Sequence, residues 1–172
     1  MGIVERQVQP IVGTFCLPRY DELPKMGLYL DQVVQYINSY FPEAMGIKVT
    51  NTMVSSYVKR GLLNHPQRRQ YDRNQVASLF IITVSRQGLS LHEIQALLRI
   101  QEERQNVEDG YNYFCAALEL ALRQSFFPGD QGERIEIPDS EEKRLIDRLV
   151  RMISCRVYLR VYLNQVQENH NS

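Results

Sequence analysis

KVTNTMVSSYVKRGLLNHPQRRQYDRNQV, residues 48–76, contains the pattern on which the expected fold of the chain is built. Apolar residues at helical spacing over residues 50–60 predict a short helix, which Gly61 ends. The loop NHPQRRQ, residues 64–70, follows and closes at Tyr71. A short helix with a polar outer face, followed by a basic loop, predicts a DNA-recognition helix and its wing.

Basic residues gather in this segment. Between residues 48 and 73 the chain has one acid, Asp72, against six basic residues: Lys48, Lys59, Arg60, Arg68, Arg69 and Arg73. The segment therefore carries a net charge of +5, and the rest of the chain carries −5 because the whole chain sums to zero. Such an asymmetry is typical of a module that binds a polyanion. A solvated basic loop without a partner has the same pattern, so charge alone leaves both interpretations open.

A second helix is expected before this segment. An apolar stripe predicts it from about residue 28 to residue 40, and Pro42 ends it. Gly46 then permits the chain reversal into the next helix, which Thr50 or Asn51 caps. The stripe consists of Leu30, Val33, Val34, Ile37 and Phe41. The order helix, turn, helix is the arrangement that many DNA-binding proteins use.

The candidate DNA contacts lie on the outer face of the recognition helix and in the loop. Short polar side chains enter a major groove without steric conflict, and adjacent arginines can clamp neighbouring phosphates. Tyr57 and Tyr71 either contact phosphate or pack the loop on the helix, and His65 is either solvated or a contact. The expected DNA-binding residues are Lys48, Thr50, Asn51, Thr52, Ser55, Ser56, Tyr57, Lys59, Arg60, His65, Arg68, Arg69 and Tyr71.

Capping boxes predict the next two helices. Asp72 with Gln75 starts a mostly buried third helix, and Ser90 with Glu93 starts a short fourth one. A polar break over residues 104–110 precedes a fifth helix.

The fifth helix is expected from about Asp109 to Phe126. A linker follows, in which RIEI, residues 134–137, is expected to be a short extended piece. Asp139 with Glu142 caps the last helix, which runs to about Val166.

The last helix has more apolar surface than one contact requires. One stripe includes Ile146, Ile153 and Val157, and Met152 and Leu159 belong to a second stripe. A helix with two apolar faces is either wedged inside the domain or shared with a second subunit, and we favour a homodimer. The expected organisation is an N-terminal arm (1–27), a helix-turn-helix domain (28–100) and a C-terminal helical part for packing or dimerisation (106–166).

Two family resemblances agree with this organisation. TNTMVSSYVKRGLL, the basic loop and YDRNQVASLFIITVSRQGLSLHEIQALL resemble the winged helix-turn-helix head of MerR-type transcriptional regulators. LPRYDELPKMGLYLDQVVQYI together with TNTMVSSYVKRGLL resembles a bacterial family called domain of unknown function 1836. The resemblance implies an all-α fold, namely a MerR-like winged helix-turn-helix with two additional C-terminal helices. MerR proteins usually have an Arg-Tyr-Tyr-Glu run where this chain has Ser55, Ser56, Tyr57 and Val58. The arginine of that run is therefore missing, and Arg60, Arg68 and Arg69 are the expected substitutes.

Other function classes find little support in the sequence. It has no phosphate-binding glycine loop, no HExxH and no nucleophile with an evident base, so we expect no enzyme and no cofactor. Cys16, Cys115 and Cys155 are expected to be buried reduced thiols, and no metal site is expected. No apolar run reaches the roughly 20 residues of a membrane span, which predicts a cytoplasmic protein.

The expected function is sequence-specific binding of double-stranded DNA by a dimeric transcriptional regulator. The alternative is a non-catalytic protein-interaction module on the same scaffold. Any small-molecule effector is unknown. Tyr111, Tyr113 and Phe114 either line a site for one or pack in the core.

Overall fold

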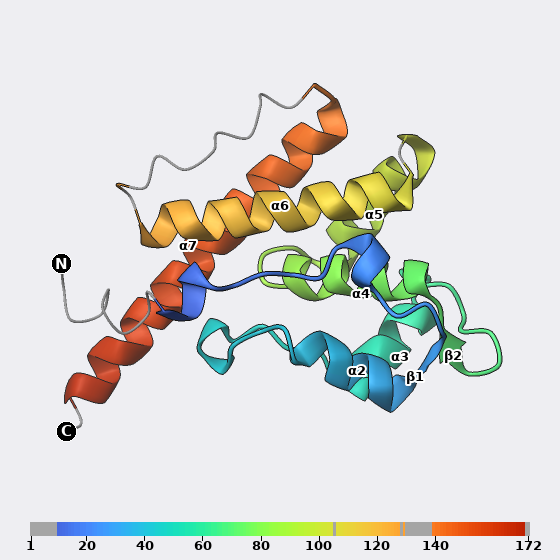
Figure 1. Cartoon of the computed structure of the whole chain (residues 1–172), viewed down its shortest axis with the longest axis horizontal. Helices are drawn as coiled ribbons and strands as arrows, with labels where there is room; N and C mark the ends of the chain where they lie inside the picture. The colour runs from blue at the N-terminus through green and yellow to red at the C-terminus, as the bar shows by residue number, and fades with distance from the viewer. Residues whose placement is uncertain (1–9, 105, 128, 130–138, 171–172) are drawn as a thin grey trace.

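In the computed structural model the chain is mostly helical, as the sequence predicts for an all-α protein, with one small antiparallel sheet (Figure 1). The structure describes residues 10–104, 106–127, 129 and 139–170. The expected extended piece at residues 134–137 lies outside the described residues. In chain order the elements are η1 (Tyr20–Glu22), β1 (Leu28–Tyr29), α2 (Leu30–Asn38), η2 (Glu43–Met45), α3 (Asn51–Lys59), β2 (Gln70–Tyr71), α4 (Arg73–Ser85), α5 (Leu91–Arg104), α6 (Val107–Phe126) and α7 (Glu141–His170).

Helix α4 lies at the centre of the molecule. Ten of its 13 residues are buried, so it has no solvent face and other elements must cover it on several sides. Figure 1 shows α2 and α3 below it and α6 and α7 above it. The ring of Phe80 joins the two layers, since it contacts Tyr36 from α2 at a centroid distance of 6.1 Å and Tyr111 from α6 at the same distance.

Both predicted capping boxes are confirmed. At the start of α4, the Asp72 N–H donates to Gln75 Oε1 and the Gln75 N–H donates to Asp72 Oδ1, each at 2.8 Å. At the start of α5, the Ser90 N–H donates to Glu93 Oε2 at 2.7 Å, and the Glu93 N–H donates to Ser90 Oγ at 3.3 Å. Each box satisfies backbone N–H groups that the first helical turn leaves free.

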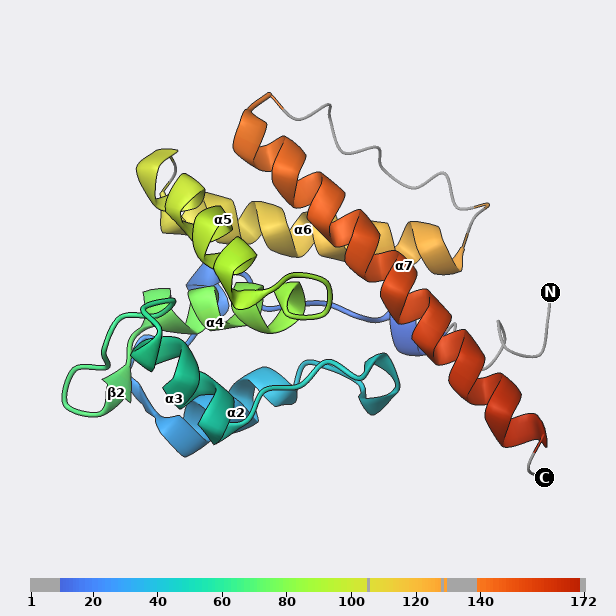
Figure 2. The ribbon, with the colours of Figure 1, turned by 180° about the vertical axis from the view of Figure 1, so that it is seen from behind.

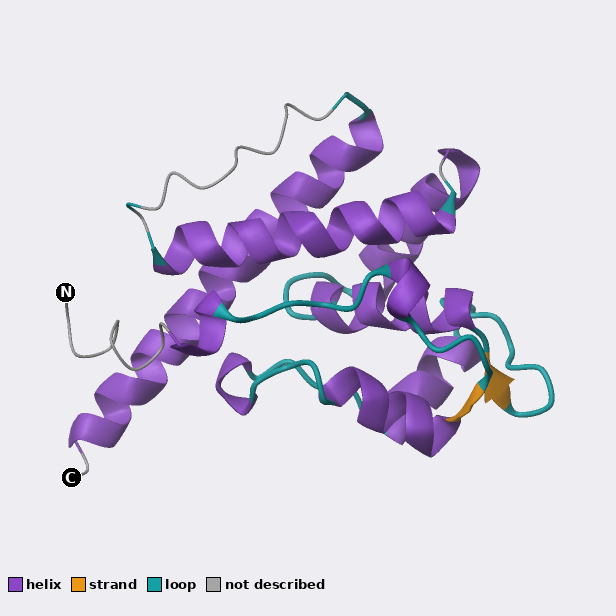
Figure 3. Cartoon of the chain, in the orientation of Figure 1, coloured by secondary structure: helices purple, strands orange, loops and turns teal. Residues whose placement is uncertain are grey.

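The prediction of a helix from residue 28 is wrong at its first two residues. Strand β1 pairs antiparallel with β2, with Leu28 opposite Tyr71 and Tyr29 opposite Gln70 (Figure 3). Helix α2 therefore starts at Leu30. The pairing partner is about forty residues further along the chain, so the local apolar spacing could not reveal it.

The predicted ends of α3 are confirmed. Thr50 is the N-cap, because its Oγ1 accepts a hydrogen bond from the Met53 N–H at 3.2 Å. At the other end Gly61 has a φ of +73°, and the Leu62 N–H donates to the Tyr57 carbonyl at 2.9 Å. This is the Schellman arrangement, in which the left-handed residue is usually glycine.

The last three helices are longer than expected. Helix α5 has 14 residues where the sequence predicts a short helix. Helix α6 starts at Val107 instead of Asp109, because Asn106 Oδ1 accepts a hydrogen bond from the Glu108 N–H at 3.2 Å and caps the helix earlier.

The start and end of α7 also differ from the prediction. Ser140 Oγ, not the Asp139 carboxylate, accepts a hydrogen bond from the Lys143 N–H at 3.3 Å. Asp139 instead forms an ion pair with the side chain of Lys143 at 2.9 Å. The helix continues to His170, past the expected end near Val166.

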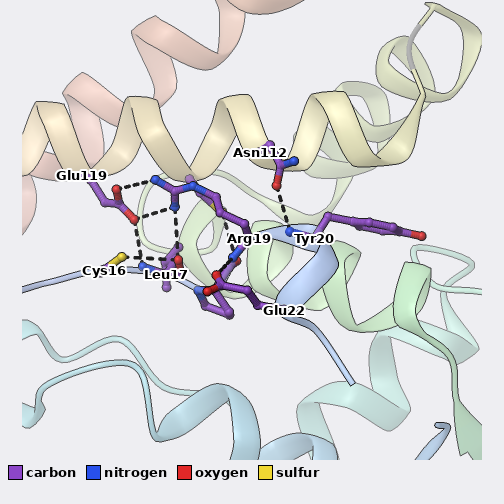
Figure 4. Close-up of polar contacts among 9 residues, drawn as sticks. Cys16, Leu17, Arg19, Tyr20, Glu22, Asn112 and Glu119 are labelled. Atoms are coloured by element: carbon purple, nitrogen blue, oxygen red, sulfur yellow. Dashed lines mark hydrogen bonds and ion pairs between the residues drawn. The ribbon is translucent and has the colours of Figure 1, made fainter. Parts of the chain in front are cut away.

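Residues 10–27, the described part of the N-terminal arm, lie across α4, between α6 and α2 (Figure 1). Figure 4 shows how it is held: the Arg19 guanidinium donates to both carboxylate oxygens of Glu119 on α6, at 2.8 Å each. The Leu17 N–H donates to Glu119 Oε1, and the Tyr20 N–H donates to Asn112 Oδ1, also at 2.8 Å. One buried cluster runs from Val12 to Val161, so the arm, the middle segment and the C-terminal helices share a core.

The environment of Glu119 shifts its pKa. Burial by itself raises this pKa, but the hydrogen bonds from Arg19 and from the Leu17 N–H, with the charge of Arg19, outweigh burial and lower it below its usual value. A carboxylate with a lowered folded-state pKa contributes stability above its unfolded-state pKa. That stability is lost as the pH falls through the folded-state pKa.

Glu119→Gln is therefore expected to lower the free energy of unfolding by about 2 kcal/mol at pH 7, because charge-assisted hydrogen bonds are lost. The difference from wild type should narrow as the pH falls from about 5 to about 3, where the wild-type carboxylate becomes protonated. Urea unfolding at each pH measures it. Glu43→Gln, at an exposed carboxylate, is the control. If the variant is less stable than wild type by the same free energy of unfolding at every pH, the charge of Glu119 does not have this role.

Candidate nucleic-acid interface

Helix α3 has one apolar face and one polar face. Val54 and Tyr57 are buried against the core. Thr52, Ser55 and Lys59 are exposed at positions i, i+3 and i+7, which lie on one side of a helix. Figure 2 shows α3 at the near surface, with no described element in front of it. The polar face that the sequence predicts is therefore open to a partner.

The basic loop projects beyond the end of α3, next to the small sheet (Figures 2 and 3). It closes as a tight hairpin: Gln67 and Gln70 form an antiparallel bridge, and the Gln70 N–H donates to the Gln67 carbonyl at 2.9 Å. Arg68 and Arg69 are the two central residues, with φ angles of +51° and +63°. Both arginines are exposed, so two guanidinium groups extend from the tip of a short turn.

The backbone of this turn is strained. A two-residue hairpin turn with both central residues left-handed favours Asn-Gly, because other side chains crowd the following carbonyl. The cost is roughly 1–2 kcal/mol for each ordinary residue. The turn geometry itself has no need for arginine at either position. Strain of this kind is often found at functional sites, and here it favours a role for the two charges.

Eleven of the 13 predicted contacts lie at the surface, exposed or half-buried: Lys48, Thr50, Asn51, Thr52, Ser55, Ser56, Lys59, Arg60, His65, Arg68 and Arg69. The other two do not. Tyr57 is 2% exposed and Tyr71 is 5% exposed, and burial raises the pKa of both hydroxyls. Their burial agrees with the packing alternative, and we leave both out of the interface.

Two of the surface residues already have partners. Thr50 Oγ1 caps α3, and Asn51 Nδ2 donates to a carboxylate oxygen of Asp31. Asp31 belongs to the first turn of α2 and is exposed. This acid lies 20 residues before Asn51, so it falls outside the basic segment of residues 48–73 and the sequence gives no sign of the contact. It places a negative charge beside the start of α3.

Arg73 makes structural contacts within the molecule, so we leave it out of the candidate interface. Its Nη2 donates to the Leu23 carbonyl at 3.1 Å, and its guanidinium lies 5.4 Å from the centre of the Tyr20 ring. Arg73 therefore connects the arm to α4. Five of the six basic residues in the segment remain exposed: Lys48, Lys59, Arg60, Arg68 and Arg69.

A polar cleft of about 620 Å³ separates the basic loop from α5. Its lining includes the side chains of Asn64 and Gln67 from the loop, Asn74 from α4 and Gln95 from α5. Its volume lies in the range of small-ligand sites. The three aromatic residues that are candidates for an effector site do not line this cleft. Tyr111 and Phe114 are buried in the core, and Tyr113 is half-buried.

The cysteines only partly match the prediction of buried thiols. Cys115 is buried, and burial raises its pKa to about 12, which keeps it a thiol. Cys16 and Cys155 are exposed, so the prediction is wrong for these two. Within the described residues, no three His, Cys, Asp or Glu side chains gather as a metal site would require. No described helix is long and apolar enough to cross a membrane.

This chain belongs to the family Domain of unknown function (DUF1836), whose family model matches residues 18–114. The match covers just over half of the chain and includes α2 to α5, so the whole candidate interface lies within it. Neither the comparison with curated proteins nor the comparison with solved structures gave a match.

Replacing Arg68 by Asn and Arg69 by Gly is expected to raise the free energy of unfolding by about 1 kcal/mol, because these residues adopt the turn without strain. Urea unfolding of the double variant measures the gain. Arg68→Ala with Arg69→Ala is the matched control, since it removes both charges and keeps both Cβ atoms. If the Asn-Gly variant is no more stable than the alanine variant, the turn is not strained.

Proposed function

We propose that this protein is a sequence-specific double-stranded DNA-binding protein that acts as a transcriptional regulator. In this proposal α2 and α3 form a helix-turn-helix, and the loop over residues 64–70 is its wing. The observation that carries the proposal is the pair of strained arginines at the hairpin tip, beside a helix whose polar face is uncovered. Two planar guanidinium groups on a short turn suit two neighbouring phosphates of one strand.

Helix α3 is suited to the major groove by its size and its side chains. An α-helix with its side chains is about 10–12 Å across, and the groove is about 12 Å wide. Thr52, Ser55 and Lys59 supply hydroxyl and ammonium groups along one line. Hydroxyl groups pair with several base edges, whereas lysine favours guanine. In this arrangement α3 reads sequence, and the loop positions the protein on the backbone.

The charge distribution supports a contact with phosphates. Lys59 faces bases in this proposal, which leaves four exposed basic residues, Lys48, Arg60, Arg68 and Arg69, for phosphates. If all four neutralise phosphates, the logarithm of the affinity should fall with the logarithm of salt concentration at a slope of about −3.6. Asp31 opposes this attraction. The resemblance of residues 28–100 to the MerR-type head also favours DNA as the partner, with Arg60, Arg68 and Arg69 in place of the missing helix arginine.

A homodimer completes the proposal. Two copies related by a two-fold axis would present two α3 helices to two half-sites of a palindromic operator. A DNA-binding regulator of this kind would work in the cytoplasm.

Arg68→Ala with Arg69→Ala should weaken binding to all DNA sequences alike, by roughly 50-fold at 0.1 M salt, because two phosphate contacts are lost. The salt slope should change from about −3.6 to about −1.8. Fluorescence anisotropy on labelled genomic fragments, between about 50 and 200 mM salt, measures both quantities.

The matched control removes the same charge elsewhere. Arg123→Ala with Arg151→Ala changes two exposed arginines on α6 and α7, and its slope should equal that of wild type. Ser55→Ala and Lys59→Ala should change which fragments are preferred, since these residues face bases in the proposal. An unchanged affinity of the Arg68 and Arg69 variant would contradict the wing. A wild-type protein that binds no DNA at low salt, and co-purifies with a protein, would instead support the interaction-module alternative.

Asp31→Asn should strengthen DNA binding up to about fivefold, because it removes a repulsive charge worth up to about 1 kcal/mol near the backbone. The same anisotropy titration measures the change. Asp21→Asn is the control, since Asp21 is an exposed acid of η1 in the arm. If both variants change the affinity for DNA equally, only the net charge of the protein affects binding, and the position of Asp31 beside α3 does not.

A further inference from the structure

The exposed face of α7 carries an apolar stripe at heptad spacing. Leu145, Met152 and Leu159 lie seven residues apart, and Cys155 and Tyr162 follow three residues after the last two of these. All five are exposed, with Leu159 at 56%. Alternating steps of three and four residues are the repeat by which two helices pair. The core uses the opposite face of α7, which includes Ile146, Val150, Ile153, Val157 and Val161. Of the stripe itself, Met152 lies against Gly88, and the side chains remain partly exposed.

The two halves of this face have complementary shapes. Beside the N-terminal half lies an apolar groove of about 390 Å³, which α5 and α7 form together. Its apolar lining includes Ala96, Leu97, Ile100, Leu145, Leu149 and Met152.

The C-terminal half carries a ridge instead. Leu159, Tyr162 and Leu163 are 41–56% exposed. They belong to the part of α7 that extends past α6 in Figure 2. One helix therefore carries both an apolar groove and an apolar ridge that fits such a groove.

We propose that a second copy of this chain covers this face, with the two α7 helices antiparallel, so that the ridge of each copy lies in the groove of the other. A two-fold interface requires a patch that is complementary to itself, and a ridge and a groove on one helix meet that requirement. The groove is centred near residue 149 and the ridge near residue 161, about 18 Å along the helix. The two-fold axis then passes near Cys155.

The arginines of α7 distinguish the two possible orientations. Arg148 interrupts the stripe in its N-terminal half, whereas residues 162–167 have no charged side chain. In a parallel pair Arg148 would face its own copy, and the two like charges would repel. In the antiparallel pair it faces the Tyr162 region of the other copy, where its guanidinium can lie against an aromatic ring. Arg156 lies near the axis and faces its own copy in either orientation, so it does not discriminate.

The test measures oligomeric state without DNA, so its outcome is independent of the proposed DNA binding. The chain of residues 1–172 is expected to sediment as a dimer. Its Leu159→Asp, Leu163→Asp variant is expected to sediment as a monomer with an unchanged circular dichroism spectrum. Met26→Asp changes an apolar residue that is 83% exposed outside α7, and this control should remain a dimer. A monomeric wild type, or a dimer that survives the double substitution, would overturn the proposal.

Cross-linking tests the orientation. With Cys16→Ser, a short bismaleimide should join two copies through Cys155. With Cys16→Ser and Cys155→Ser, Leu145→Cys should not cross-link to itself, whereas Leu145→Cys combined with Val166→Cys should. In the antiparallel pair residue 145 lies beside residue 166 of the other copy and about 30 Å from residue 145 of that copy. Self-cross-linking of Leu145→Cys alone would show a parallel pair and overturn the antiparallel arrangement.

Discussion

Helix α4 is apolar on nearly every side, and this property governs how the rest of the chain is arranged. A helix without a polar face is stable in water only when other elements enclose it. Here α2 and the arm cover one part of it, and α6 and α7 cover another. Phe80 lies where these layers meet, among aromatic rings from both. Enclosing α4 therefore draws segments from both ends of the chain into one core.

The arm connects the two layers through polar contacts. Glu119 accepts three hydrogen bonds from the arm, two from Arg19 and one from the Leu17 N–H. At its other end the arm meets Arg73 at the start of α4, and β1 then pairs with β2 beside the basic loop. The hairpin with its strained arginines is thus attached to the core through a strand, a capping box and the arm. This attachment provides a rigid base for a turn that local preferences alone would not favour.

The candidate interface and the apolar face of α7 belong to different parts of the molecule. The first consists of polar and basic side chains on α3 and the loop, and the second of apolar side chains on α7. Under the proposed function the two surfaces cooperate, because α7 brings two copies together and each copy contributes one α3. In that proposal Asp31 limits the attraction to phosphates, which leaves the side chains of α3 a larger share in selecting a sequence.

The sequence by itself determined the features that depend on residues within about four positions of each other. The capping boxes at Asp72 and Ser90, a cap of α3 at Thr50 or Asn51, the Gly61 end of α3 and its polar face are all of this kind, because helix ends and faces are local properties. Only the tertiary structure decided the pairing of β1 with β2, the burial of Tyr57 and Tyr71, the use of Arg73 to hold the arm and the place of Asp31 beside Asn51. It also decided the left-handed turn at Arg68 and Arg69, since two-residue turns of this kind usually contain Asn-Gly and an Arg-Arg pair does not predict one. These features depend on residues far apart in the chain, or on backbone strain that the rest of the fold supports, and neither leaves a local pattern in the sequence.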